Sequence, residues 1–366
     1  MFLYEDIMNH QMAFAHGGEY TDYNQIKLDF SVNTNPLGMP GNLSYALTTN
    51  VDVLEKYPDR RSRELCLAIS EKRGVPSDNI FVGNGASEVI SLLAKVLAPK
   101  NALIIEPTFS GYERALLSNG SKVSYYELTR ENEYTLTQDF IAFLEKAKCG
   151  AIFACSPNNP TGHIIDLALV EEIAEICEKK KIFFILDECF MGFVENSDSR
   201  SCQKLLADHP HLILLDAFTK LYCIPGIRLG YCISSNNELI KALYDAQPEW
   251  SVSTYAQLAG KEALSEERYV KRTVELVSTE RDYLIKELRL LGFEVYDSQA
   301  NFILFNVAST LKKNRNLQEY LAKKHHILIR SCDNFKGLTE GDYRIAVKLH
   351  DENELLIEAL KSFLSL

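Results

Sequence analysis

Lys220 and Arg228 stand in the run "TKLYCIPGIRLGY" (219–231), which is otherwise apolar and interrupted by glycines. Loss of solvent disfavours the charged form of a lysine and lowers its pKa. The neutral amine that results is a nucleophile towards carbonyl groups. We therefore predict a reactive amine at Lys220. For the lysine taken alone, a surface position with its stem along apolar atoms is the commoner arrangement.

A pair of carboxylates, Asp187 and Glu188, follows "IFFIL" (182–186), which belongs to the most apolar strand candidate in the chain. Burying an unpaired carboxylate costs several kcal/mol. Asp187 must therefore have a partner, and the run "LLDAFTK" (214–220) should bring Lys220 to the same end of the sheet. The structural alternative is a carboxylate at a strand end that caps the next helix.

The run "FVGNGASEV" (81–89) indicates a place for an anion. A strand is expected to end at Gly83, a Gly-x-Gly turn with Gly85 follows, and a helix should begin near Ser87. The N–H groups of Ala86 and Ser87 then have no partner within the helix, and the helix dipole favours negative charge, most simply a phosphate. A tight turn between a strand and a helix would give the same residues without any ligand.

The run "SPNNPTG" (156–162) contains Asn159 and follows the strand candidate "GAIFAC" (150–155). Two asparagines and two prolines are typical of a surface turn. This loop, however, follows the carboxyl end of an expected central strand, where a ligand would bind in a sheet of this kind.

The elements that must position these residues recur between about 79 and 233. Apolar runs alternate with helical patterns, such as the one over 89–97, and several runs are apolar throughout, as strands buried on both faces should be. This alternation predicts an α/β fold with a mostly parallel sheet covered by helices. The expected strands are 79–83, 101–106, 122–128, 150–155, 181–188, 211–216 and 227–233.

After about residue 240 the pattern changes to a long helical stretch (roughly 254–290) and four short apolar runs, at 293–298, 301–307, 326–331 and 343–348. This predicts a smaller α+β domain. The first 45 or so residues contain no βα unit and are expected to pack beside it. We therefore predict a large domain over 45–240 and a small domain made of 1–44 and 241–366.

The composition limits the partners. The chain has 366 residues, a formal net charge of −11 and 46% hydrophobic residues. Neither nucleic acid nor an anionic membrane is attracted to an acidic surface, so the counter-charges for an anionic ligand must be local. The nine cysteines form no C-x-x-C pair or zinc-like cluster, so we expect reduced thiols, no metal and a cytoplasmic protein. Glu5 and Asp6 do not fit a signal peptide.

Taken together and in order, "SPNNPTG", "LDECF" and "TKLYCIPGIRLGY" match a known set of motifs. These are Asn-Pro-x-Gly, Asp-Glu-x-(Tyr/Phe) and (Ser/Thr)-Lys-x(7)-Arg-x-Gly. The chain resembles the fold-type-I pyridoxal-phosphate (PLP) enzymes of the aminotransferase class I/II superfamily from about residue 16 to 344. The resemblance implies PLP as cofactor, and a large domain with a mostly parallel seven-stranded sheet beside a smaller α+β domain.

The resemblance also implies roles for single residues. Lys220 would bind PLP covalently and later move protons at the substrate's α-carbon. Asp187 would pair with the pyridinium nitrogen and keep it protonated, which makes the ring an electron sink. Asn159 would bond the phenolic oxygen, and Phe109 would stack on the ring face.

Two anionic groups have implied partners as well. The cofactor phosphate would lie at the turn of Gly85, bound by the N–H groups of Ala86 and Ser87 and by the side chains of Thr219 and Arg228. Tyr57 would reach this phosphate from the partner subunit, which implies a homodimer with its active site at the interface. Arg344 would bind the substrate's α-carboxylate.

Two branches of the superfamily handle phosphorylated amino acids, and the chain resembles both. Histidinol-phosphate aminotransferases carry Asp-Glu-Ala-Tyr, where this chain has Phe190 in place of the tyrosine. The runs "AHGGEY" (15–20), "LDFSVNTNPLGMP" (28–40) and "LIRSCDNFKGL" (328–338) look more like L-threonine-O-3-phosphate decarboxylase of corrinoid biosynthesis. His16, Asn33 and Arg330 then become candidates, with Asn159, to contact the substrate; a turn or capping histidine is the alternative for His16.

Both reactions break a bond at the α-carbon, and the bond perpendicular to the cofactor ring is the one that breaks. Loss of the hydrogen gives transamination, and loss of the carboxylate gives decarboxylation. We favour decarboxylation, with histidinol-phosphate or related transamination as the alternative. A non-catalytic PLP-fold module of a transcription regulator is a remote third reading, because such modules follow a basic DNA-binding segment and this chain is acidic.

Overall fold

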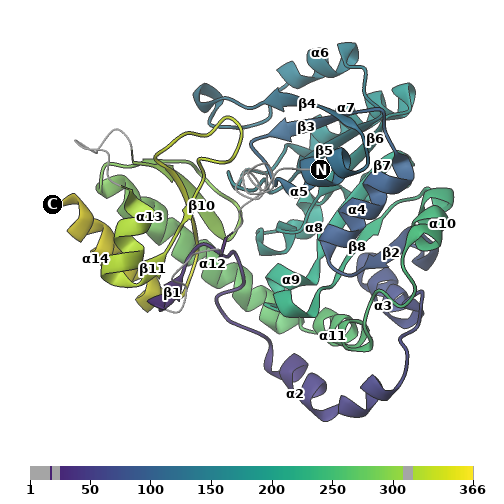
Figure 1. Cartoon of the computed structure of the whole chain (residues 1–366), viewed down its shortest axis with the longest axis horizontal. Helices are drawn as coiled ribbons and strands as arrows, with labels where there is room; N and C mark the ends of the chain where they lie inside the picture. The colour runs from purple at the N-terminus through teal and green to yellow at the C-terminus, as the bar shows by residue number, and fades with distance from the viewer. Residues whose placement is uncertain (1–16, 19–24, 308–315, 366) are drawn as a thin grey trace, which may run out of the picture.

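A mostly parallel seven-stranded sheet is the centre of the computed structural model, which describes residues 17–18, 25–307 and 316–365 (Figure 1). The strand order is β2-β8-β7-β6-β5-β3-β4. Only β8 runs antiparallel to its neighbours in this sheet. The α/β fold class predicted from the sequence is confirmed, and each expected strand is present: β2 (Ile80–Gly83), β3 (Asn101–Glu106), β4 (Lys122–Glu127), β5 (Ala151–Cys155), β6 (Phe183–Asp187), β7 (Leu212–Ala217) and β8 (Gly230–Ile233).

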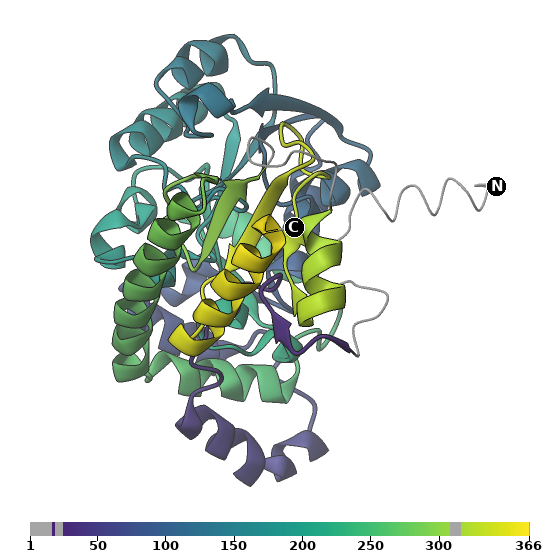
Figure 2. The ribbon, with the colours of Figure 1, turned by 90° about the vertical axis from the view of Figure 1, so that its left-hand side faces the viewer.

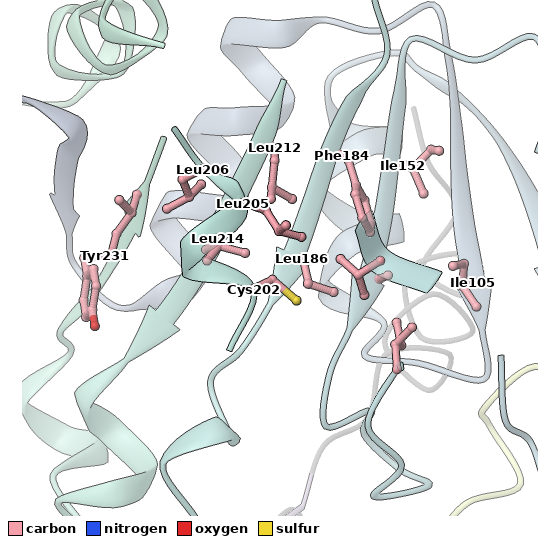
Figure 3. Close-up of a cluster of buried hydrophobic side chains, with 14 of the residues drawn as sticks. Ile105, Ile152, Phe184, Leu186, Cys202, Leu205, Leu206, Leu212, Leu214 and Tyr231 are labelled. Carbon is pink, nitrogen blue, oxygen red and sulfur yellow. The ribbon is translucent and has the colours of Figure 1, made fainter. Parts of the chain in front are cut away.

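The central strands are apolar throughout because both faces of the sheet are covered. Along β6, Phe184 and Leu186 point into one buried cluster, while Ile185 between them points into another. Figure 3 shows part of the first cluster, in which Phe184 and Leu186 lie between Ile152 of β5 and Leu214 of β7. A strand with two buried faces needs apolar side chains at every position, which explains the pattern seen in the sequence.

Helices supply the cover on both sides. The first cluster includes residues from α3 (Arg63–Arg73), α6 (Asp139–Lys146), α7 (Leu167–Lys180) and α11 (Thr254–Leu264). The second includes residues from α4 (Ala86–Leu97), α5 (Gly111–Ser118) and α10 (Asn237–Ala246). Two one-turn helices, α8 (Ser197–Arg200) and α9 (Phe218–Leu221), follow β6 and β7.

The expected helix over 254–290 is in fact two helices, α11 and α12 (Glu267–Leu290). Ser265 lies at the break, where its hydroxyl donates to the Glu262 carbonyl and competes with the helical pattern. The two helices also have different partners. α11 packs on α2 (Gly41–Thr49) and α3, whereas α12 packs on α14 (His350–Leu364) and β10 (Phe302–Asn306) (Figure 2).

A second sheet lies beside α12, with the strand order β12-β13-β10-β9. The expected strand over 326–331 is divided between two sheets. Its first half, β11 (Ile327–Leu328), pairs parallel with β1 (Leu28–Asp29) from the N-terminal segment. Its second half, β12 (Arg330–Ser331), pairs with β13 (Asp342–Ala346). The remaining elements are β9 (Glu294–Val295) and α13 (Leu317–Tyr320).

The division into domains at 45 and 240 stays a prediction. In the part of the chain that the structure describes, no helix has both the length and the apolar character needed to span a membrane.

Candidate active site

A pocket of about 640 Å³ opens at the carboxyl ends of β3, β5, β6 and β7, and residues of β12 and β13 form part of its wall. Most of the residues singled out from the sequence line it. They are Asn33, Ala86, Ser87, Phe109, Asn159, Asp187, Thr219, Lys220, Arg228, Arg330 and Arg344. The pocket thus gathers side chains from the N-terminal segment, the central sheet and the second sheet.

Three predicted residues are not part of this lining. Gly85 lies directly behind the wall, next to the Arg228 guanidinium. Tyr57 is 79% exposed in the single chain and contacts the Trp250 ring, with 4.6 Å between the ring centroids. His16 lies outside the described residues.

Lys220 is held at the pocket wall by α9, which begins directly after β7. Burial lowers the pKa of its amine to about 8, and the nearby cations of Arg344 and Arg228 act in the same direction. A larger fraction of the amine is therefore neutral near physiological pH than for an ordinary lysine. Arg228 differs from Lys220: it is exposed in the single chain, and its backbone has a φ of 60°.

Asp187 ends β6 with its carboxylate buried and both oxygens bonded. The hydroxyl of Tyr112 donates to Oδ2 at 2.5 Å, and the backbone N–H of Cys189 donates to Oδ1 at 2.9 Å. Burial raises the pKa of Asp187, and hydrogen bonds from the Cys189 thiol, the Tyr112 hydroxyl and the Cys189 N–H partly oppose the increase. Sequence reasoning missed Tyr112, since a tyrosine in the first turn of a helix carries no signal of a partner on another strand.

The start of α4 forms a cradle with Arg228. Gly85 has a φ of 78°, and a Cβ atom there would lie 2.6 Å from the Arg228 guanidinium. A Cβ atom on Gly230 would lie 2.4 Å from the backbone nitrogen of Ala86. Both positions therefore require glycine. The helix N-terminus and the guanidinium together favour an anion such as a phosphate. The sequence motif included Gly230, but its steric role was not foreseen.

Arg344 presents a buried guanidinium to the pocket. It donates to the side-chain oxygen of Asn159 and, at 2.7 Å, to the carbonyl of Ser31. Its Nε has no hydrogen-bond partner among the described residues, and none of their carboxylates forms an ion pair with it. Burial lowers its pKa to about 10. A guanidinium in this position favours an anionic ligand.

Two further predicted substrate residues lie in the same pocket. The side-chain oxygen of Asn33 is buried without a partner among the described residues. Arg330 donates to Asn334 at 2.7 Å, and its guanidinium lies 5.4 Å from the centre of the Phe335 ring. The pocket is thus lined by two guanidinium groups, on Arg330 and Arg344, and by the Asn33 side chain.

Glu106 is a buried carboxyl group of this pocket that sequence reasoning did not single out. It ends β3, is 4% exposed, and accepts the N–H of Thr108 at 2.7 Å. Burial raises its pKa to about 7, and the hydrogen bond from Thr108 and the cation of Lys336 partly oppose the increase.

We expect Glu106 to make the stability of the cofactor-free protein depend on pH. The folded state binds the proton more tightly than the unfolded chain, so stability is lost as the pH rises from about 4.5 through about 7. Glu106→Gln removes this loss and keeps an acceptor for Thr108. The free energy of unfolding, measured with urea, should rise in the variant relative to the wild type by up to about 3 kcal/mol between about pH 5 and about pH 8. A difference that does not change with pH would contradict the prediction.

Comparison with known proteins shows to which protein family the chain belongs. The family model for aminotransferase class I and II matches residues 25–360. The chain belongs to this family. The match covers all three sheets of the described residues and, apart from Gly17, every residue that lines the pocket. It makes the chain an enzyme of this family, with the fold that the sequence motifs implied.

The chain is similar to members of two branches of this family. The chain is 34% identical to the threonine-phosphate decarboxylase of Salmonella typhimurium, over 96% of this chain and 97% of that protein. It is 32% identical to the histidinol-phosphate aminotransferase of Methanococcoides burtonii, over 89% and 87%. The solved histidinol-phosphate aminotransferase of Clostridium acetobutylicum superposes with a TM-score of 0.84, at 30% identity, and the match covers 92% of this chain and 99% of that one.

Proposed function

We propose that this enzyme uses PLP to decarboxylate L-threonine O-3-phosphate. The observation that carries the proposal is the pair of guanidinium groups of Arg330 and Arg344, in a pocket that also holds Lys220 and Asp187. That arrangement suits a small substrate with two anionic groups, and L-threonine phosphate carries a carboxylate and a phosphate. The similarity to the Salmonella decarboxylase supports the same substrate.

The residues present fit PLP in three respects. Lys220 offers an amine of lowered pKa for the aldehyde. Asp187 offers a buried carboxylate without an ion-pair partner among the described residues, which suits a protonated ring nitrogen. The cradle of Gly85 and Arg228 suits the phosphate, with the N–H groups of Ala86 and Ser87 and the side chain of Thr219 nearby.

Within this site, Phe109 would cover the ring face and the amide of Asn159 would donate to the ring oxygen, since its carbonyl already accepts from Arg344. PLP, when bound, supplies an electron sink for the negative charge that develops at the substrate's α-carbon. Arg344 would hold the carboxylate, and Arg330 and Asn33 would hold the phosphate. The Lys220 amine would then deliver a proton to the α-carbon after carbon dioxide has left.

The direct test is an assay of purified protein with PLP and L-threonine O-3-phosphate. We expect carbon dioxide and one equivalent of the phosphorylated amino alcohol, without any 2-oxo acid. Production of glutamate from histidinol phosphate and 2-oxoglutarate, with no carbon dioxide from L-threonine phosphate, would overturn the proposal. The structural match to the Clostridium acetobutylicum enzyme is the observation that favours this alternative, histidinol-phosphate transamination.

Arg344→Gln is expected to lower kcat/KM for L-threonine phosphate by about a hundredfold, because a carboxylate in the pocket loses its buried charged partner. Steady-state kinetics on the variant measure the loss. Arg281→Gln is the matched control. Arg281 is another buried arginine of lowered pKa, but its guanidinium donates to the carbonyls of Gln299 and Ala300, and it does not line the pocket. An equal loss in both variants would contradict the role of Arg344.

We also propose that the enzyme is a homodimer and that Tyr57 completes the site of the partner subunit. Tyr57 does not line the pocket of its own chain. It follows a segment with exposed large apolar side chains: Met39 before α2, Tyr45 on α2, and Val51 and Leu54 in the turn after α2. A second copy of the chain would cover them.

Mixing two impaired variants, at a PLP concentration well below the dissociation constant of the Tyr57→Ala variant, tests this arrangement. Tyr57→Ala alone is expected to weaken PLP binding about tenfold, since it removes a hydrogen bond to a charged phosphate. Lys220→Ala alone is expected to be inactive. After random exchange of subunits, about one quarter of the sites should combine an intact Lys220 with an intact Tyr57 across the interface. Activity should therefore rise above that of either variant; no rise after proven exchange would place Tyr57 outside the partner's site.

A further inference from the structure

Tyr112 contacts both side chains that we place against the cofactor ring. Its hydroxyl donates to Oδ2 of Asp187 at 2.5 Å. Its ring meets the Phe109 ring edge to face, with 5.6 Å between the centroids and 84° between the planes. Tyr112 itself is fully buried, and its ring also packs against the Phe153 ring, with 5.6 Å between the centroids. One immobilised side chain therefore links the proposed partner of the ring nitrogen with the proposed partner of the ring face.

The surroundings of Asp187 make this hydroxyl important. The titratable groups that face its carboxylate are Tyr112 on α5, Cys155 on β5, Cys189 after β6 and Asp216 on β7. None of them is a cation. The groups that stabilise the charged carboxylate are the thiol and the N–H of Cys189 and the Tyr112 hydroxyl, and the hydroxyl is the donor that comes from another element.

We propose that Tyr112 is a positioning residue: it fixes Asp187 and Phe109 in one relative geometry and keeps Asp187 charged for the cofactor. This inference rests on the proposed use of PLP. Tyr112 itself would not touch the reacting atoms, because its hydroxyl is already occupied by Asp187 and its ring by Phe109.

The sign of the effect follows from the hydrogen bond. A donor to the charged form lowers the pKa of a carboxyl group, so removing the hydroxyl raises the pKa of Asp187 further. Binding of PLP that requires a charged Asp187 is lost as the pH falls through this pKa. In the variant, that loss should begin at a higher pH than in the wild type.

Tyr112→Phe tests the inference because it keeps the ring and removes only the hydroxyl. The readout is the dissociation constant of PLP, measured by absorbance titration of the cofactor-free protein across a range of pH. We expect binding about tenfold weaker at neutral pH, near the lower end of the range for one hydrogen bond to a charged group. The pH below which binding is lost, the acid limb of the profile, should lie higher than in the wild type. Tyr112→Leu, which also removes the contact with Phe109, should bind more weakly still.

The matched control is Tyr231→Phe. Tyr231 is also buried, and its hydroxyl donates at 2.8 Å to Asp216, a carboxylate that does not line the pocket. This variant should bind PLP as the wild type does at every pH. A second check adds Tyr112→Phe to the Asp187→Asn variant. Without the carboxylate, loss of the hydroxyl should hardly change the pH dependence of PLP binding.

The outcomes separate the two proposals. If the wild type does not bind PLP, the proposed function fails. If the wild type binds PLP and Tyr112→Phe follows Tyr231→Phe, the positioning role alone is overturned. Thermal melting of each cofactor-free variant shows whether it is folded, and a merely structural role would lower the melting temperature without moving the acid limb.

Discussion

Lys220→Ala is expected to abolish the covalent attachment of PLP and to lower the rate of decarboxylation by about four orders of magnitude or more, because one side chain both holds the cofactor and moves the proton. After borohydride reduction, mass spectrometry should find PLP bound to the wild type and absent from the variant. Capture by the wild type should become faster as the pH rises through about 8, where the amine loses its proton.

The control for labelling is Lys336→Ala. Lys336 also lines the pocket, but its amine is paired with Glu113 at 2.8 Å. This variant should retain the label. Stoichiometric labelling of Lys220→Ala, or loss of the label from Lys336→Ala alone, would show that the reactive amine is a different lysine.

Asp187→Asn is expected to lower kcat by about a hundredfold to a thousandfold, the range measured when a preorganised electrostatic partner is removed from a transition state. The amide has nearly the shape of the carboxylate, so it separates the loss of charge from the loss of packing. An amide cannot carry the negative charge that pairs with a protonated ring nitrogen. The bound cofactor should therefore absorb at a different wavelength from that in the wild type, and kcat measured with saturating PLP should fall.

Glu106→Gln is the matched control for this substitution, since it also neutralises a buried carboxyl group of the same pocket. It should leave the spectrum of bound PLP unchanged. An Asp187→Asn enzyme with wild-type kcat and spectrum would show that the carboxylate does not meet the ring.

The strands and the site motifs could be predicted because their signals are local. Each central strand has two covered faces, so Phe184, Ile185 and Leu186 are all apolar and the run is recognisable without its neighbours. Lys220 and Asp187 directly follow such runs. Strand ends of a parallel sheet meet at one edge, so the two residues could be placed together from sequence order and spacing.

Three features of the site could not be predicted from local sequence patterns. The bond between Tyr112 and Asp187 joins residues 75 positions apart, and that between Arg344 and Asn159 joins residues 185 apart. Arg228 is exposed although it stands in a mostly apolar run. None of these arrangements is encoded in the spacing of neighbouring residues.

The sequence alone thus determined which reactive groups are available: an amine, a carboxylate and a glycine turn beside strand ends. Short segments are enough to identify them, because residue type and strand periodicity are properties of neighbouring positions. The partners that set the charge and orientation of those groups come from other elements. They depend on how α5 packs on the sheet and how the second sheet closes the pocket. Packing brings together residues that are distant in the chain, and burial then determines their proton affinities.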